Sequence, residues 1–264
     1  MEPLYLTAFA AIGVVAGLLA GLLGIGGGAV IVPALIVLFT QLGFSDAWVP
    51  HQAAATSLAT VIATGAASAW THHRRGAVRW DLFVRLVPWI LLGAWLGASI
   101  VGWLPAIWLK RLFGLFLLYN AARMFSGRSP KSHGPLPSKR ILGAFATVFG
   151  ALSALLGIGG GILMVPFLVR RGVTMQRAVA TSSACGVPMA LAGSIGFMLS
   201  GWARDGLPPH SIGFVYWPAA IAIMVASMPM ATLGARLAHQ LPTATLRRIF
   251  GLLLLAAGLR LLLA

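Results

Sequence analysis

Two glycine clusters are the parts of the chain whose residues best suit the binding of an anion. Residues 22–28 are Leu-Leu-Gly-Ile-Gly-Gly-Gly, and the same seven residues recur at 155–161, each copy followed by Val-Pro. Consecutive glycines free backbone N–H groups, and a helix that begins there directs its positive end at an anion. The alternative is that they only allow close helix packing. The predicted anion ligands are Gly26, Gly27, Gly28, Gly159, Gly160 and Gly161.

Hydroxyl side chains follow both clusters at matching positions. Thr56 and Ser57 return in the second copy as Thr181 and Ser182, with Ser183 beside them, and each group lies a few residues into an apolar run. In membrane helices such hydroxyls often bond to their own backbone or to a neighbouring helix. Because the Thr-Ser pair recurs, we interpret these residues as further ligands. Neutral hydroxyl donors suit a small oxyanion that must bind and then leave.

Polar residues at the starts of the apolar runs are candidates for gating or proton coupling. An imidazole changes charge near neutral pH, so His51 is the group we expect to couple a proton to the anion, with a plain interfacial histidine as the alternative. Arg111 and Arg248 occupy equivalent positions, where anion capture competes with snorkelling at the interface. The gating candidates are His51, Gln52, Gln176, Arg177, Arg111 and Arg248.

The clusters do not fit nucleotide-binding loops. Ile162 stands where the dinucleotide pattern requires Gly or Ala, and no Lys-Ser or Lys-Thr follows either copy. The single cysteine, Cys185, and the small number of acidic residues, four in all, argue against a metal site built by the protein. No Ser-His-Asp, His-Glu-x-x-His or paired-carboxylate arrangement is present. We therefore predict no cofactor, no metal and no enzymatic activity.

The composition indicates a membrane protein. Hydrophobic residues make up 59% of the 264 residues, charged residues 9%, and the mean hydropathy is +0.93, whereas soluble domains carry about 25% charged residues. The net charge is +15, and the basic residues lie mostly in short links, which favours the cytoplasmic face and anionic lipid over nucleic acid. The few acids lie at segment ends or in links, so an anionic substrate is favoured over a cation.

Six apolar runs are long enough to cross a membrane, and two further stretches are broken by the glycines. After each glycine cluster the apolar run extends only about 18 Å or about 12 Å, too short to cross. We expect each broken stretch, 4–40 and 141–169, to enter and leave by the same face as a helical hairpin. The six predicted crossings are Ala53–Trp70, Leu82–Leu104, Leu109–Phe125, Ala178–Leu199, Ile212–Ala235 and Ile249–Leu263.

The predicted fold is an all-α integral membrane protein of two homologous repeats. Residues 1–126 form the first repeat, 127–138 a cytoplasmic linker and 139–264 the second repeat. Three crossings plus one hairpin is an odd number, so the second repeat is expected to be inverted relative to the first. With both termini outside, this arrangement places most of the 19 basic residues inside, and more of them than parallel repeats would.

The doubled Leu-Leu-Gly-Ile-Gly-Gly-Gly motif with its Val-Pro and Ala-Thr-Ser segments resembles the sulfite exporter TauE/SafE family over nearly the whole chain. The resemblance implies a bacterial inner-membrane secondary transporter for a small sulfur-containing anion, of the sulfite, sulfonate or sulfoacetate class, driven by protons. It also implies that the glycine clusters and the Thr-Ser pairs line the pathway. Alternating access between the repeats is the expected mechanism. A passive small-anion channel is the alternative, and the oligomeric state stays open.

Overall fold

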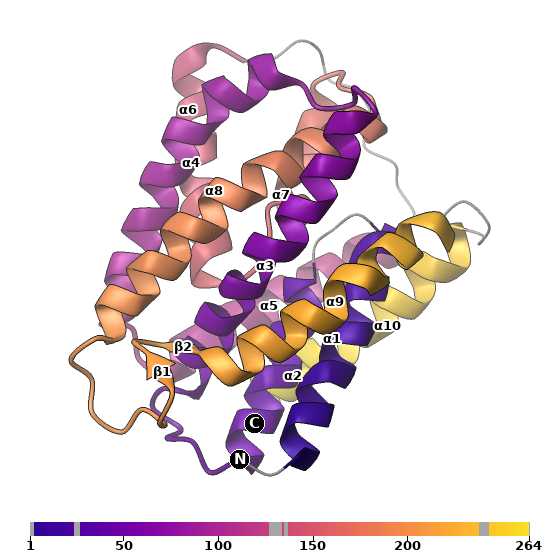
Figure 1. The fold of residues 1–264 in the computed structure, drawn as a ribbon. Helices are drawn as coiled ribbons and strands as arrows, with labels where there is room; N and C mark the ends of the chain where they lie inside the picture. Colours follow the sequence, from indigo (N-terminus) through magenta and orange to yellow (C-terminus); the bar gives the residue numbers. More distant parts are fainter. Residues whose placement is uncertain (1–2, 24–26, 127–133, 135–136, 238–242, 264) are drawn as a thin grey trace.

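The computed structural model describes residues 3–23, 27–126, 134, 137–237 and 243–263. This part of the chain forms ten α-helices and one β-hairpin (Figure 1). The helices of the first half are α1 Pro3–Leu23, α2 Gly28–Gln41, α3 Val49–Arg74, α4 Trp80–Val101 and α5 Ala106–Phe125. Those of the second half are α6 Lys139–Leu155, α7 Gly161–Arg170, α8 Met175–Gly201, α9 Trp217–Leu237 and α10 Thr243–Leu263.

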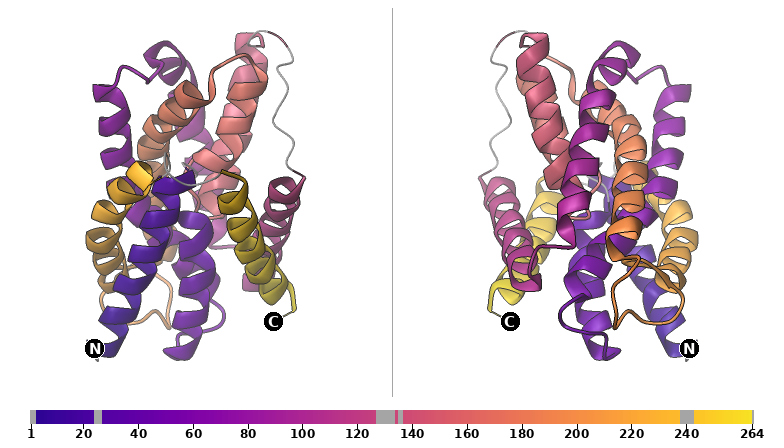
Figure 2. Two further views of the ribbon diagram at one scale, coloured as in Figure 1. Left: turned by 90° about the vertical axis from the view of Figure 1, so that its right-hand side faces the viewer. Right: turned by 90° about the vertical axis from the view of Figure 1, so that its left-hand side faces the viewer.

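Each glycine cluster separates two helices that double back on one another. In Figures 1 and 2, α1 rises from the lower end of the molecule and α2 returns to it, while α6 and α7 do the same from the upper end. The helix after each cluster begins at a glycine: Gly27 is the N-cap of α2, and Gly160 is the N-cap of α7. Helices α2 and α7 therefore both begin inside the molecule.

The helices of the two halves exchange partners. Helix α1 packs along α9, and in the same way α6 packs along α4, while α3 lies against α8 and α5 against α10. Glycines allow these close approaches, since a Cβ on Gly17 would lie 2.4 Å from the Ser227 carbonyl oxygen, and one on Gly97 would lie 2.6 Å from the Ala151 carbonyl oxygen. In the absence of a hydrophobic driving force between membrane helices, such backbone contact is a main source of association.

Five helices in the described part are long and apolar enough to cross a membrane: Leu4–Leu22, Val49–Arg74, Trp80–Val101, Met175–Gly201 and Trp217–Gly234. Four of them contain or overlap predicted crossings. The first was expected to be one arm of a hairpin, and by length and composition alone it could cross. Large apolar side chains on their outer faces, such as Val84, Trp95 and Val225, are exposed, as expected where a helix meets lipid.

Three predicted crossings differ from the structure in detail. The run predicted from Ile249 to Leu263 lies within α10, and its apolar part, Phe250–Leu263, is shorter than the five helices that could cross. Helix α5 does not meet the composition for a crossing, because Lys110, Arg111 and Arg123 lie within it. The run predicted from Ile212 to Ala235 becomes helical only at Trp217, because residues 211–216 form the antiparallel hairpin of β1 Ser211–Ile212 and β2 Val215–Tyr216. This hairpin is a small exception to an otherwise all-α fold.

Candidate functional site

The start of α2 and the segment that leads into α7, which we call the hairpin tips, touch near mid-height of the molecule (Figure 2). A Cβ on Gly28 would lie 2.5 Å from the Gly157 carbonyl oxygen and 2.8 Å from Ile158 Cα, so the start of α2 lies directly against the second glycine cluster. The hydroxyl of Ser57, on α3, donates a buried hydrogen bond of 2.7 Å to that Gly157 carbonyl. Segments about a hundred residues apart thus converge on one point.

Gly157 has to be glycine for two separate reasons. Its φ is +65°, in the left-handed region that side chains disfavour, and a Cβ would lie 2.6 Å from Ala54 Cα and 2.7 Å from the Ala54 carbonyl oxygen. The second cluster can therefore press its backbone onto α3. Gly27, Gly28, Gly159, Gly160 and Gly161 are all buried. Gly26, the remaining predicted ligand of this type, lies outside the described residues.

The two predicted threonines make equivalent hydrogen bonds in the two halves. Thr56 Oγ1 accepts from the backbone N–H of Tyr216 at 3.1 Å, and Thr181 Oγ1 accepts from the backbone N–H of Arg79 at 3.1 Å. Each N–H belongs to the residue immediately before a helix, α9 in the first case and α4 in the second. Each threonine therefore holds the start of a helix from the other half, a positioning role that the sequence did not reveal.

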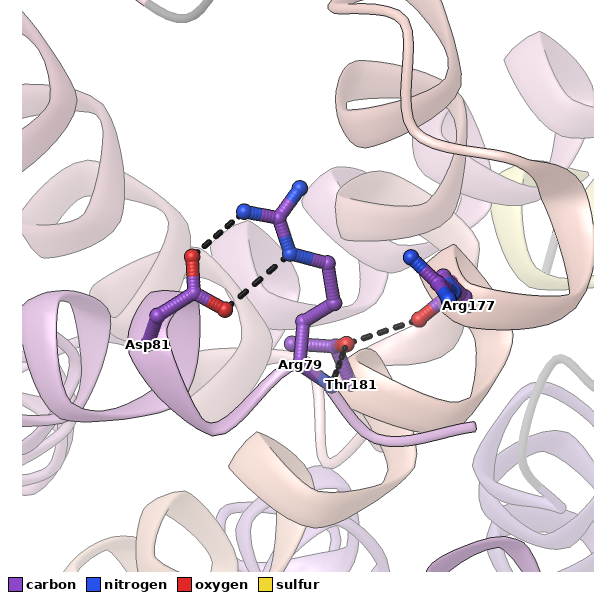
Figure 3. A network of polar contacts seen from close by, with 4 residues as sticks. All are labelled: Arg79, Asp81, Arg177 and Thr181. Atoms are coloured by element: carbon purple, nitrogen blue, oxygen red, sulfur yellow. Dashed lines mark hydrogen bonds and ion pairs between the residues drawn. The ribbon is translucent and has the colours of Figure 1, made fainter. Parts of the chain in front are cut away.

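Figure 3 shows the second of these contacts. Thr181 also donates to the Arg177 carbonyl oxygen at 2.7 Å, a bond to its own helix. Beside it, the guanidinium of Arg79 forms an ion pair with the carboxylate of Asp81 at the start of α4. A carboxylate in the first turn of a helix interacts favourably with the positive end of the helix dipole, so Asp81 and its ion pair stabilise the start of α4.

The start of α7 lies against the second group of hydroxyls. A Cβ on Gly160 would lie 3.2 Å from the Ser182 carbonyl oxygen and 3.4 Å from its Oγ. Ser182 is fully buried, and its Oγ has no hydrogen-bond partner among the described residues. Gly186 lies one turn further along α8 and also faces Gly160. A Cβ added to Gly186 would lie 3.6 Å from the Gly160 nitrogen, which is an ordinary van der Waals contact. A buried donor without a partner is costly, so this hydroxyl is available to a ligand.

His51 and Gln52 lie at the opposite end of the bundle from Arg177 and are fully buried. His51 Nε2 lies 3.1 Å from the Val101 carbonyl oxygen and 3.0 Å from that of Leu104. Because carbonyls only accept, Nε2 carries a proton and donates. Nδ1 of His51 and both side-chain polar atoms of Gln52 have no partner among the described residues.

The equivalent residues of the second half are placed differently. Gln176 and Arg177, at the start of α8, are exposed, and so are Arg111 on α5 and Arg248 on α10. Arg111 lies over the ring of Trp108 at 5.9 Å, an arrangement typical of an interfacial residue. The structure thus brings the glycines, Ser57 and Ser182 together and leaves the arginines at the periphery.

Three hydroxyl residues of α3, namely Ser68, Thr60 and Thr64, were not singled out from the sequence. Ser68 on α3 donates to Ser183 on α8 at 3.3 Å, linking the two central helices. Thr60 and Thr64 belong to the same face of α3 as Ser57 and Ser68. Their spacing of three or four residues is the one feature of the sequence that could have indicated this shared face. In the described part, no three or more His, Cys, Asp or Glu side chains gather where they could hold a metal ion.

The fold and the site together define a multi-pass α-helical membrane protein with a polar centre made of glycine-broken hairpins. The family model of the sulfite exporter TauE/SafE family matches residues 9–261. The chain therefore belongs to this family.

Similar proteins are found in bacteria and in an archaeon. A probable membrane transporter protein of Haemophilus influenzae is 34% identical over 96% of both chains. Proteins with the same description from Methanocaldococcus jannaschii (28% identical, covering 96% of this chain and 93% of the relative) and Xylella fastidiosa (30%, 92% and 89%) are also similar. No solved structure matches this chain.

Proposed function

We propose that this protein is a secondary transporter that moves a small sulfur-containing anion, of the sulfite, sulfonate or sulfoacetate class, across the bacterial inner membrane. The observation that carries the proposal is the contact between the two hairpin tips, where Gly28 meets Gly157 and the hydroxyls of Ser57 and Ser182 lie beside them. Two helices begin at this point, and their positive ends favour an anion. Membership of the TauE/SafE family and the transporter names of the relatives support the same class.

The two halves act as inverted repeats in this proposal. The exchange of partners between α1 and α9 and between α6 and α4, together with hairpins that enter from opposite ends, supports such an arrangement. Both termini lie at the same end of the molecule in Figure 2, which we assign to the outer side because the arginines of the α3–α4 connection lie at the other end. The anion would bind at the tips and be released as one repeat rocks against the other.

His51 is the proposed proton-coupling residue. It is the one imidazole or charged side chain that is fully buried in the described part of the chain, and its Nδ1 is free there to accept a proton. Substitution of His51 by Gln keeps an N–H donor for the Val101 and Leu104 carbonyls but removes the titrating group. We expect His51→Gln to lose uptake driven by a pH gradient while keeping exchange of anion for anion. Gradient-driven uptake at the normal rate would remove His51 from the mechanism.

The test of the function is the flux of sulfite and sulfoacetate in proteoliposomes, with internal pH read at the same time. A transporter gives saturable uptake and counterflow, whereas a passive channel, the alternative, cannot produce counterflow. We expect Gly160→Leu to abolish the flux, because a side chain there meets Ser182. Ala66→Leu, at an exposed position of α3, is the matched control and should transport normally. Normal flux in Gly160→Leu would contradict the proposed site.

A further inference from the structure

Helix α3 carries a ladder of hydroxyl side chains that leads away from the hairpin tips. Ser57, Thr60, Thr64, Ser68 and Thr71 follow one another at intervals of three or four residues, which places them on one face of the helix. We call these five residues the hydroxyl ladder. The face points inward, since Ser57 bonds to the Gly157 carbonyl and Ser68 to Ser183 on α8.

The burial of α3 changes sharply along its length. Every residue from Val49 to Val61 is buried, but from Ile62 to Arg74 none is. Thr64 and Ser68 are half-buried, and Thr71 is exposed. The accessible surface of the ladder therefore grows steadily from the hairpin tips to the end of α3.

The equivalent face of α8 is closed. A Cβ on Gly196 would lie 2.4 Å from Ala98 Cβ, and one on Gly193 would lie 2.9 Å from a methyl of Leu58. Ser200 Oγ donates to the Ala98 carbonyl oxygen at 2.8 Å, which ties the same part of α8 to α4. The hydroxyl ladder of α3 is therefore accessible because of the end of the molecule at which it lies, since the equivalent face of α8 at the other end is closed.

Groups suited to an anion lie at both ends of the ladder. At its inner end, Ser182 Oγ is fully buried and has no partner among the described residues, and it lies beside the start of α7. At its outer end Trp70, Thr71, Arg74 and Arg75 line a shallow, open depression of the surface, which we call the arginine pocket. A positive rim concentrates anions, and a wall of neutral donors passes them inward without holding them tightly.

From these observations we infer that the hydroxyl ladder of α3 is the wall of a water-filled vestibule, through which a sulfonate-type anion passes between the arginine pocket and the hairpin tips. The inference rests on the proposed function and adds to it the route on one side of the membrane. Thr60, Thr64 and Thr71 now donate to carbonyls of their own helix, at 2.6, 3.0 and 2.9 Å. A hydroxyl rotates easily, so each can donate to a passing anion in turn.

Cysteine labelling tests the vestibule directly. In a Cys185→Ala background, single cysteines replace Thr64 and Ser68, and Ala66→Cys serves as the matched control because it lies at the same depth on the opposite, exposed face. The probe is a membrane-impermeant methanethiosulfonate that carries a sulfonate, compared with its trimethylammonium analogue. Membrane vesicles of either orientation present one end of the molecule at a time.

We expect Thr64→Cys and Ser68→Cys to react at least tenfold faster than Ala66→Cys, because a thiol in lipid stays protonated and unreactive. The reaction should occur only from the arginine end, and the sulfonate reagent should react several times faster than the cationic one. Sulfoacetate should slow it. Two ladder positions are used so that a variant that fails to fold does not decide the result.

Several outcomes would overturn the inference: equal rates at Ala66→Cys, reaction from the His51 end alone, or a preference for the cationic reagent. The labelling needs no transport, so its failure is distinguishable from failure of the proposed function. If the ladder reacts as expected while sulfite and sulfoacetate show neither flux nor protection, the vestibule stands and the substrate class falls. If flux occurs without labelling of the ladder, the transporter stands and this route falls.

Discussion

Helices α3 and α8 occupy equivalent places in the two halves, yet α3 is buried at its start and accessible at its end, whereas α8 is exposed at its start and buried further along. Helix α3 is fully buried over its first thirteen residues, Val49 to Val61, and has no buried residue afterwards. Helix α8 begins with the exposed Met175, Gln176 and Arg177 and keeps buried residues as far as Gly201. Both differences have the same sense: the α3–α8 pair is buried at the His51 end and accessible at the Arg177 end, which under the proposed function we interpret as a sealed end and an open end. A transporter that alternates would pass through the reverse arrangement.

The seal has an identifiable structural cause. The connection between α8 and α9 is long, and its hairpin places Phe214 against His51 and Trp48, with ring centroids 5.2 Å apart in both pairs. The corresponding connection between α3 and α4 runs only from Arg75 to Arg79; it contacts α8 at Thr181 but leaves Met175, Gln176 and Arg177 exposed. The difference between the two ends therefore comes from a loop that is present in one half only.

The largest effect is expected where the two halves touch. Gly157→Ala puts a Cβ 2.6 Å from Ala54 Cα at a φ of +65°, and we expect a loss of about 3 kcal/mol or more of stability, with little folded protein. Gly206→Ala, whose φ is +78° with nothing near the added Cβ, should cost only about 1 kcal/mol. Thermal unfolding in detergent measures both. Equal losses would mean that the contact of the tips with α3 is unimportant.

Much of this fold follows from the sequence. Composition identifies the membrane class, and the repeat of Leu22–Gly28 at Leu155–Gly161 locates both helix breaks, because consecutive glycines weaken a helix and let the backbone pack closely where protein buries it. The hairpin at 211–216 was missed, since its residues are as apolar as the helix that follows. The backbone hydrogen bonds between its two strands replace those of a helix, and hydropathy does not distinguish an apolar strand from an apolar helix.

The candidate site was only partly predictable. Recurrence in the two halves identified Thr56 and Thr181. It does not distinguish an anion ligand from a residue that holds Tyr216 or Arg79 in place, because a protein of two repeats needs either role once in each half. The burial of His51 depends on Phe214, a residue 163 positions away in the sequence, and no local pattern reports such a contact. Tertiary placement, not residue type, decides these roles.

The two threonines offer the next test of the comparison. Thr56→Val removes a buried hydroxyl that accepts from the Tyr216 N–H, so we expect a loss of about 1.5 kcal/mol of stability. Thr181→Val removes the same contact from Arg79 in a half-buried place, where water can substitute, so the loss should stay below about 1 kcal/mol. Unfolding of both variants and of the double variant gives the values. A larger loss in Thr181→Val would reverse the assignment of the sealed end.

Arg204 is the next prediction, because it fastens the seal. Its Nη2 donates to the Gly102 carbonyl oxygen at 2.9 Å, and its guanidinium lies 5.3 Å from the Trp48 ring centroid and 5.8 Å from that of Trp103. Removing these contacts in Arg204→Ala should lower the free energy of opening at this end by about 1 kcal/mol.

Amide hydrogen exchange around Trp48 and Phe214 measures that opening. Exchange should be about fivefold faster in Arg204→Ala, as 1 kcal/mol implies, and unchanged in Arg177→Ala at the open end. Arg204→Lys retains the charge over the rings and should show an intermediate rate. Unchanged exchange in Arg204→Ala would mean that the apolar contacts of Phe214 hold the seal without it.

The smallest effect concerns the arginines at the open end. Arg74 and Arg75 are exposed, so they act on an approaching anion through a field that salt screens within about 8 Å at physiological ionic strength. In vesicles that present this end outward, replacing both arginines by Gln should raise the KM of anion transport about two- to fivefold at low salt and leave kcat unchanged. At high salt the double variant should have the KM of the unaltered protein. Arg111→Gln should not change KM in the same vesicles, because α5 begins at the sealed end, directly after the Leu104 carbonyl that bonds to His51. Because a bound arginine ligand would resist salt and lower kcat as well, this measurement separates steering into an open vestibule from direct coordination of the anion.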